Sequence, residues 1–412
     1  MNRARRLWIP AVHLPHGREL LRPFPYRPSL FKRILKCYSE RFLLLCERRD
    51  SIVLPKRPET KYMEFLLGLG LGTENIIVCD AGSDNFAADI LNDETTMSKL
   101  SRCAEDVHPS SFYIHLEEER EIARRLGRED AVTNPALTRM FNSIYFLIRL
   151  EEELEVAAIK RRQIRSSRFA ESAAPLLENE GALFVRGNES IGGSQVYLLK
   201  TDADIEKAHK KVCRNRQITR YFASKLLEPA ESWNVQYELT QDGAAFLGAS
   251  RQLLENHAHA GNAGDGRAPG DVIDTAQSLA RRLWEMGALG TVGIDVIAAD
   301  DKAYGVEINA RHNTSTPLIH ALRKLSGKEN GIRTMFRSFS LYVERDFNFR
   351  SFTELVGREN LLTQDGKTGF LPYHFDACQL SGKLDVAAFA ANEAELNRLA
   401  RLLPETSIPD YS

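Results

Sequence analysis

The sequence has few cysteines, and their arrangement indicates neither a disulfide framework nor a zinc site. No Cys-x-x-Cys pair occurs, and zinc-binding His/Cys spacing is absent. In a chain of this length such cysteines are expected to be free thiols of a reducing compartment. The six are Cys37, Cys46, Cys79, Cys103, Cys213 and Cys378.

Long hydrophobic segments are also missing. No stretch approaches the ~18 uninterrupted apolar residues that a membrane-spanning helix requires. The N-terminus has basic residues, but Pro10, His13 and Pro15 interrupt any apolar region of a secretory signal. We therefore predict a cytoplasmic protein with no membrane partner.

Neither sign of charge is in excess. The chain has 55 Lys and Arg against 56 Asp and Glu, which gives a formal net charge of −1. This balance gives no general attraction to nucleic acid, so no nucleic-acid partner is expected. With 43% hydrophobic residues among 412, the chain is typical of a folded protein that is too long for one ordinary core. Two to three domains are expected.

The pattern of apolar and turn residues divides the chain into three regions. We expect an N-terminal α/β domain at 1–130, a hairpin-rich region at 131–325 and a C-terminal α/β extension at 326–412. In the first region, short apolar runs predict buried strands at 42–46, 52–54 and 76–79.

The middle region begins with a charged helical segment, clearest at 148–160, and continues with strands joined by polar turns. Residues 255–270 are rich in Gly, Ala, His and Asn and are expected to form a loop. A helix is predicted at 272–286. Strands are predicted at 182–186, 195–199, 224–227, 233–239, 244–253, 290–298 and 302–308.

Polar side chains alternate with apolar ones on the last two of these strands. Asp295 and Glu307 lie on neighbouring antiparallel strands, whose facing residues are ~5 Å apart. Asn309 follows Glu307 by two residues and therefore points to the same side of its strand. Three oxygen ligands on one side of a hairpin suit Mg²⁺, which completes its shell with water and substrate phosphates. Arg311, two residues further on, places a permanent cation beside them.

The pattern Gly-x-Asp followed by Glu-x-Asn-x-Arg, at residues 293–311, resembles the metal-binding signature of the ATP-grasp superfamily. The resemblance extends over roughly 131–325 and implies an ATP-grasp fold, with a preceding α/β domain at 1–130 that helps to form the substrate pocket. It also implies a glycine-rich flap subdomain at about 181–230, bound ATP and one or two Mg²⁺ ions. Asp295, Glu307 and Asn309 are then the metal ligands.

The same resemblance assigns the nucleotide contacts. Arg186 ends the strand where the superfamily places a phosphate-contacting lysine, and arginine can still bind phosphate. No clear match exists for the superfamily's other phosphate-side lysine, for which Arg149 and Lys160 are candidates. The choice between Glu231 and Glu228 as the ribose-binding carboxylate stays open. The remaining implied ATP contacts are Ser190, Gly192 and Gly193 of the flap and Lys225, Leu227 and Glu231 of the adenine hinge region.

The implied reaction joins a small-molecule carboxylate to an amine or a peptide through an acyl phosphate, with ADP and phosphate as products. Arg186 and Arg311 are then catalytic, and Arg251 or Gln252 contacts the substrate. The segments 369–374 and 382–384 are similar to the tail of pheganomycin-type peptide ligases. A carboxylate–thiol ligase, a carboxylase and a non-catalytic nucleotide-binding protein stay open as alternatives. So does the oligomeric state, with a homodimer as one option.

Overall fold

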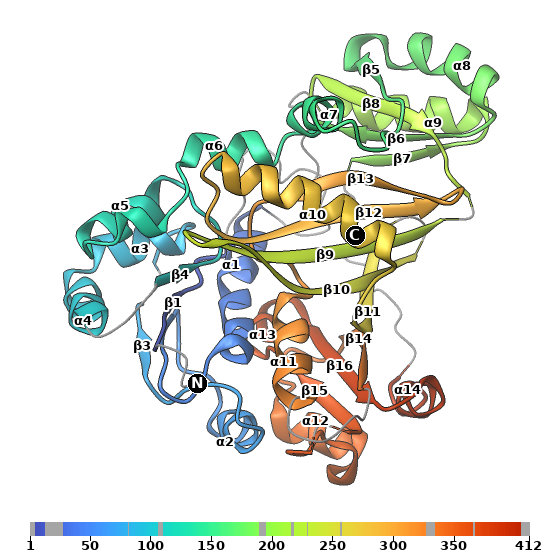
Figure 1. Cartoon of the computed structure of the whole chain (residues 1–412). Helices are drawn as coiled ribbons and strands as arrows, with labels where there is room; N and C mark the ends of the chain where they lie inside the picture. Colours follow the sequence, from blue (N-terminus) through green and yellow to red (C-terminus); the bar gives the residue numbers. More distant parts are fainter. Residues whose placement is uncertain are drawn as a thin grey trace.

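The fold consists of three β-sheets with helices packed around them (Figure 1). The structure is a computed structural model that describes residues 5–12, 28–80, 82–105, 110–188, 195–215, 218–228, 230–255, 258–326, 334–365 and 367–404. All six cysteines lie within these ranges and are free thiols, as predicted. In the described part of the chain, every helix is too short or too polar to cross a membrane.

The N-terminal sheet is parallel, with the strand order β3-β2-β1-β4. Parallel neighbours need crossover connections, and helices between the strands provide them. The predicted strands at 52–54 and 76–79 are present, but the strand expected at 42–46 is wrong, because these residues end a 3₁₀ helix. A short apolar run that is buried has no periodicity that would distinguish the two. The strands are β1 (Leu7–Ile9), β2 (Ser51–Leu54), β3 (Ile76–Val78) and β4 (Ser110–Phe112), and the helices are α1 (Pro28–Cys37), η2 (Tyr38–Leu45), α2 (Thr60–Gly68), α3 (Phe86–Asn92), α4 (Glu94–Glu105) and α5 (Glu117–Arg125).

Short helices connect this unit to an antiparallel sheet with the order β5-β8-β6-β7, which we call the flap sheet. The sequence did not predict β5, because Arg162–Arg165 carries charged side chains and buries only Ile164. The helix expected at 148–160 ends earlier, at Glu153. The connecting helices are η3 (Glu129–Ala131), α6 (Pro135–Phe141) and α7 (Ile144–Glu153), and the flap elements are β5 (Arg162–Arg165), η4 (Ser166–Arg168), α8 (Phe169–Glu180), β6 (Leu183–Gly187), β7 (Val196–Leu199), α9 (Asp202–Arg214) and β8 (Arg220–Lys225).

The central sheet has eight strands in the order β13-β12-β9-β10-β11-β14-β16-β15. The loop expected at 255–270 is wrong, because most of it forms β11 between β10 and β14. Pairing on both sides overrides the low strand propensity of its Gly, Ala and Asn residues. The strands are β9 (Glu231–Thr240), β10 (Gly243–Glu255), β11 (Ala258–Gly266), β12 (Gly290–Ala299), β13 (Lys302–Asn309), β14 (Met335–Tyr342), β15 (Gly369–Pro372) and β16 (Lys383–Ala390).

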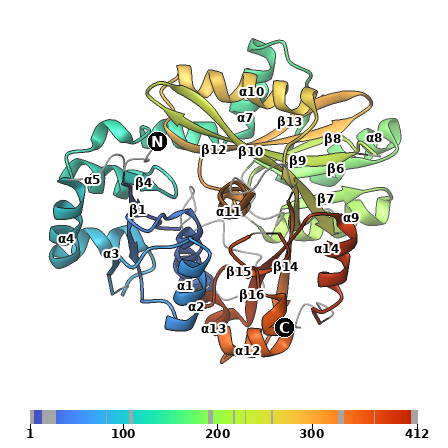
Figure 2. The same cartoon turned by 60° about the horizontal axis from the view of Figure 1, so that its bottom comes forward.

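The C-terminal strands thus extend the central sheet instead of forming a sheet of their own. Their region also shares one hydrophobic core with the N-terminal unit, in which Phe42 and Leu66 pack in the same cluster as Phe352 and Phe389. Helices α1 and α13 lie side by side at this junction (Figures 1 and 2). The other helices here are α10 (Gly270–Glu285), α11 (Thr316–Ser326), α12 (Phe349–Val356), η5 (Arg358–Asn360), α13 (Asp376–Ser381) and α14 (Glu393–Ala400). The N-terminal and C-terminal regions of the chain therefore pack together as one unit.

Candidate active site

A cavity of about 850 Å³ lies among the three sheets, and we call it the central cavity. The flap sheet contributes Phe184, Arg186 and Phe222 to its lining, and the central sheet contributes Asn234 and Asp295. The N-terminal unit closes the remaining side with aromatic and aliphatic side chains. The predicted metal ligands therefore face a space large enough for a nucleotide and a second molecule.

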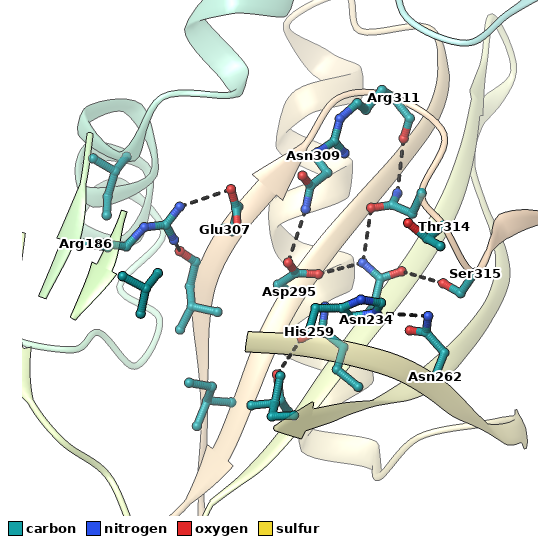
Figure 3. A pocket seen from close by; sticks show the side chains of 18 of the residues that line it. Arg186, Asn234, His259, Asn262, Asp295, Glu307, Asn309, Arg311, Thr314 and Ser315 are labelled. Carbon is teal, nitrogen blue, oxygen red and sulfur yellow. Dashed lines mark hydrogen bonds and ion pairs between the residues drawn. The ribbon is translucent and has the colours of Figure 1, made fainter. Parts of the chain in front are cut away.

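Strands β12 and β13 bring the three predicted metal ligands together (Figure 3). Asp295 pairs directly with Glu307, and Gly293 pairs with Asn309. The Asn309 amide donates to one Asp295 oxygen over 3.2 Å. All three predicted ligands line the central cavity.

Asp295 is buried and lies near a second carboxylate. Burial, followed by the negative charge of Glu307, raises the pKa of Asp295 to about 6, although Asn234 and Arg311 act in the opposite direction. A bound cation would offset the repulsion between two facing carboxylates of this kind. Among the described residues, no three His, Cys, Asp or Glu side chains form a metal-binding group. The carboxylates of Asp295 and Glu307 and the amide of Asn309 are oxygen donors of the kind that Mg²⁺ accepts, with its other oxygens from phosphates and water.

A buried network of amides and hydroxyls positions Asp295, and the sequence did not predict it. The Asn234 amide donates to the second Asp295 oxygen over 2.6 Å. The Gln236 amide in turn donates to Asn234 over 2.7 Å and to the Ser315 hydroxyl over 2.7 Å. Asn234 and Gln236 are two residues apart on β9, and their polarity within a predicted strand is the signal that could have revealed them.

Close packing explains why the signature has glycine at position 293. Asn313 lies against Gly293, and a Cβ built at Gly293 would approach the Asn313 amide nitrogen to 2.2 Å. That amide donates to the Arg311 carbonyl over 3.1 Å, which fixes the turn after β13. A side chain at position 293 would displace this turn, so the glycine serves the shape of the site.

Arg186 reaches from the flap sheet to the β12–β13 hairpin, which carries the predicted metal ligands and which we call the metal hairpin. Its guanidinium lies 3.0 Å from a Glu307 oxygen and donates to the Val306 carbonyl over 2.9 Å. Figure 3 shows Arg186 reaching Glu307 from the side opposite to Asn309. The predicted phosphate contact and a predicted metal ligand thus form an ion pair in this structure. The predicted flap residues Ser190, Gly192 and Gly193 lie outside the described residues.

Two carboxylates were candidates for the ribose contact, and the structure separates them. Glu228 lines the central cavity together with Lys225 and Leu227, and Glu231 is not part of the lining. Glu231 instead lies 3.7 Å from Arg251, and both side chains are half exposed. Glu231 lies on β9, where successive side chains point to opposite sides of the sheet, and its own side chain points away from the cavity.

That alternation also separates Arg251 from Gln252 on β10. Gln252 lines the central cavity and accepts a hydrogen bond from the Ser232 hydroxyl over 2.5 Å. Arg251 is not part of the lining. Of the two residues predicted to contact the substrate, Gln252 is therefore the one that faces the cavity.

The second phosphate-side cation was sought at Arg149 and Lys160, and neither lines the cavity. Arg161, the neighbour of Lys160, does line it. Its guanidinium lies 2.5 Å from a buried Glu151 oxygen and donates to the Gly305 carbonyl over 2.8 Å. This pairing neutralises its charge and joins the start of the flap unit to β13.

Arg311 lines the cavity beside the metal ligands. Its Nε atom is buried and has no hydrogen-bond partner within the described residues. A buried guanidinium donor without a partner is costly, and an oxyanion beside it would remove that cost. Arg311 lies at the cavity close enough to Asp295 for its charge to lower the pKa of that carboxyl.

Comparison with known proteins gives the same fold. Residues 170–315 match the family model of an ATP-grasp domain. N5-carboxyaminoimidazole synthase from Aspergillus clavatus, in complex with ADP and 5-aminoimidazole ribonucleotide, superposes with a TM-score of 0.54 at 12% identity, over 97% of this chain and 98% of that one. N5-carboxyaminoimidazole synthetase from Staphylococcus aureus does so with 0.54 at 9% identity, over 97% of each chain.

A third structure is the biotin carboxylase domain dimer of the Hydrogenobacter thermophilus 2-oxoglutarate carboxylase, in complex with MgADP, ADP and bicarbonate. It superposes with a TM-score of 0.52 at 11% identity, over 99% of this chain and 91% of that one. Structural similarity at this level of sequence identity shows the fold, and the family model identifies the ATP-grasp domain within it. The predicted ATP-grasp fold is thereby confirmed, and residues 170–315 match an ATP-grasp domain.

Proposed function

We propose that this protein is an ATP-dependent ligase that joins a carboxylate to an amine through an acyl phosphate. The observation that carries the proposal is the set formed by Asp295, Glu307 and Asn309 on the wall of the central cavity. Such a set suits a nucleotide-bound Mg²⁺ ion, whose chemistry is the neutralisation of charge on transferring phosphate oxygens. The ATP-grasp domain match supports the same proposal.

The nucleotide would lie between the flap sheet and the metal hairpin. Phe184 and Phe222 line that part of the cavity with apolar surface suited to a base, and the backbone of 225–227 follows at the end of β8. Glu228 is the carboxylate within reach of a ribose there. Arg186 would exchange its Glu307 partner for phosphate oxygens, which accept bidentate hydrogen bonds from arginine.

The reaction then has two steps. A carboxylate oxygen of the substrate attacks the γ-phosphorus, the bond to the β,γ-bridging oxygen breaks, and ADP leaves with that electron pair. The amine next attacks the acyl carbon, loses a proton and expels phosphate, so that an amide forms. Positioning and charge neutralisation supply most of the catalysis in such transfers. Arg311 faces the cavity where it can offset charge on the oxyanion of the second step.

Carboxylation is the second candidate, and a specific observation favours it. The matched structures include carboxyaminoimidazole synthetases and a biotin carboxylase domain with bicarbonate. Bicarbonate can take the place of the organic carboxylate in the first step. ADP release that requires bicarbonate, and no organic acid, would support this candidate.

Product analysis tests the proposal. The protein is incubated with Mg²⁺, ATP and pooled amino acids and peptides, with and without bicarbonate, and products are identified by mass spectrometry. We expect ADP, phosphate and an amide, whereas AMP and pyrophosphate would contradict the acyl-phosphate route. Glu307→Gln should reduce turnover on the order of 10³-fold or more, because it removes charge at the metal. The matched control is Glu285→Gln, on the exposed end of α10. Equal activity of the two variants would contradict the metal assignment.

A further inference from the structure

The wall of the central cavity formed by the two chain ends carries a charged cluster that the proposed reaction does not use. Arg41 of η2 lines the cavity, and its guanidinium contacts the buried Asp385 of β16. The Lys383 ammonium lies 3.4 Å from the other Asp385 oxygen, and the Ser340 hydroxyl donates to that oxygen over 2.8 Å. We call Arg41, Lys383 and Asp385 the terminal-wall cluster.

The charges of this cluster do not balance. Arg41 and Lys383 are cations, and Asp385 is a single anion; although burial acts against ionisation, Lys383 and Arg41 hold the Asp385 pKa well below its usual range. His374 Nε2 lies 2.9 Å from Arg41 and 2.9 Å from Asp385. Burial, followed by the charge of Arg41, lowers the pKa of His374 to about 4, so this ring is neutral near pH 7. The cluster therefore carries one excess positive charge.

Arg41 is the member of the terminal-wall cluster that lines the cavity, and Lys383 and Asp385 are not part of the lining. The Arg41 side chain is only 12% exposed, and its Nε atom is buried without a hydrogen-bond partner among the described residues. One side of the guanidinium is covered by the Tyr38 ring, at 3.8 Å from the ring centroid. Two cations that share one buried carboxylate are only partly compensated, and an anion that enters the cavity would offset the remaining charge.

The surface next to Arg41 is apolar and aromatic. Phe31, Leu35, Tyr38, Phe42 and Tyr113 line this part of the cavity. The polar side chains that line the cavity nearby include His312, whose ring lies 4.9 Å from that of Phe42, and His259 and Asn262, which bond each other over 3.1 Å. A phosphate dianion on a sugar would require two free cations and several hydroxyl partners here. One excess charge and apolar walls suit a monoanion with a hydrophobic body.

We infer that the terminal-wall cluster binds the free carboxylate of the amine substrate, and that this substrate ends in an apolar or aromatic amino acid. The inference rests on the proposed ligase function and names the acceptor class for that same cavity. A carboxylate that becomes an acyl phosphate cannot stay at Arg41, so the carboxylate held there belongs to the molecule that supplies the amine. Its side chain lies among the aromatic residues, and its amine points toward the metal hairpin.

Binding calorimetry on the full-length protein with Mg²⁺ and ADP tests the inference without turnover. The probes are L-phenylalanine, glycyl-L-phenylalanine and L-phenylalaninamide, which keeps the hydrophobic body but lacks the carboxylate. We expect the two acids to bind and the amide to bind at least ~10-fold more weakly, since a charge-assisted hydrogen bond is lost. Tighter binding of the dipeptide assigns the acceptor as a peptide, and tighter binding of phenylalanine assigns it as a free amino acid.

Variants of the cluster give the second readout. Arg41→Gln should weaken phenylalanine binding on the order of 10- to 100-fold and leave Mg–ADP affinity unchanged. The double variant Arg41→Gln, Asp385→Asn removes both charges of the buried Arg41–Asp385 pair and leaves Lys383 as the charge of the cluster. Because Arg41 lines the cavity and Lys383 does not, this variant should show the same loss. The matched control is Arg350→Gln, on the exposed surface of α12. It should leave both affinities unchanged.

The outcomes separate this inference from the proposed function. Equal binding of acid and amide, or unchanged phenylalanine binding in the double variant, would overturn the inference. So would a protein that binds Mg–ADP but neither acid. A wild-type protein that fails to bind Mg–ADP would instead remove the proposed ligase function itself.

Discussion

The central cavity has two charged walls of opposite sign, and they are built differently. The metal hairpin places Asp295 and Glu307, twelve residues apart in the sequence, on paired strands. The terminal-wall cluster joins Arg41 to Asp385 across 344 residues. On the hairpin, two carboxylates lie beside Arg186 and Arg311, whereas in the terminal-wall cluster two cations share one carboxylate. The hairpin therefore suits a cation and the terminal wall an anion, which is the separation that a two-substrate ligase needs.

The two walls also differ in the groups that hold their central carboxylates in place. Asp295 is held by a buried network of side chains that starts at Asn234. Asp385 is held by charged groups from both ends of the chain. Changes on each side can therefore break one wall and leave the other unchanged.

The largest effect is expected from breaking the support of the hairpin. Asn234→Ala removes the 2.6 Å donor to a buried Asp295 oxygen. Loss of such a metal-supporting contact costs roughly 10- to 100-fold in metal affinity or activity, and the free energy of unfolding should fall by about 1–3 kcal/mol. Steady-state kinetics and urea unfolding measure the two quantities. Asn397→Ala, on the exposed face of α14, is the control. Wild-type activity in Asn234→Ala would contradict the role of the network.

A smaller effect is expected from changing the arginine that pairs with the metal hairpin. Arg186 pairs with Glu307 in this structure and so competes with a metal ion for that carboxylate. Arg186→Gln should therefore tighten Mg²⁺ binding to the nucleotide-free protein, by roughly the 0.2–1 kcal/mol of a weak ion pair, and should weaken ATP binding. Calorimetry with Mg²⁺ alone and with Mg–ATP measures both. Weaker Mg²⁺ binding in the nucleotide-free variant would show that Arg186 does not compete for the site.

The smallest effect on ligand binding is expected at the helix that carries Arg41, where the measurable change is in how stability varies with pH. Glu40 accepts hydrogen bonds from the backbone N–H groups of Phe375 and Asp376, over 2.6 and 3.0 Å. Burial, followed by the charge of Asp376, raises the pKa of Glu40 from 4.5 to about 8. Because the folded state then holds a proton that the unfolded state has lost, stability falls as the pH rises from 4.5 to about 8.

Glu40→Gln should remove that dependence, so its unfolding free energy should vary less with pH in this interval than that of the wild type. Chemical unfolding followed at several pH values measures the slope. Parallel slopes for variant and wild type would show that Glu40 does not hold a proton in the folded state.

The sequence predicts what short-range patterns specify. The β12–β13 hairpin could be predicted because Asp295, Glu307, Asn309 and Arg311 alternate with apolar residues on either side of a turn. Asp300 and Asp301 form that turn, and both adopt positive φ. The flap strand Leu183–Gly187 was found for the same reason. Where burial removes the alternation, as in Phe42–Cys46, the pattern could not separate strand from helix.

Contacts between segments far apart in the chain could not be predicted from local sequence patterns. Nothing local to Arg41 indicates that β16 will supply Asp385, because the contact depends on a sheet that the C-terminal strands extend. Arg161 was missed in favour of Lys160 because a one-residue difference decides which side chain faces the cavity. Residue type alone does not determine that direction.

The most direct test of the central claim is the fate of a carboxylate oxygen. Once product analysis has identified the carboxylate substrate, it is labelled with ¹⁸O and converted with Mg²⁺, ATP and the amine. An acyl phosphate requires one labelled oxygen to leave with the phosphate in each turnover. We predict that label in the inorganic phosphate. Phosphate without ¹⁸O, released together with the amide, would contradict the proposed reaction.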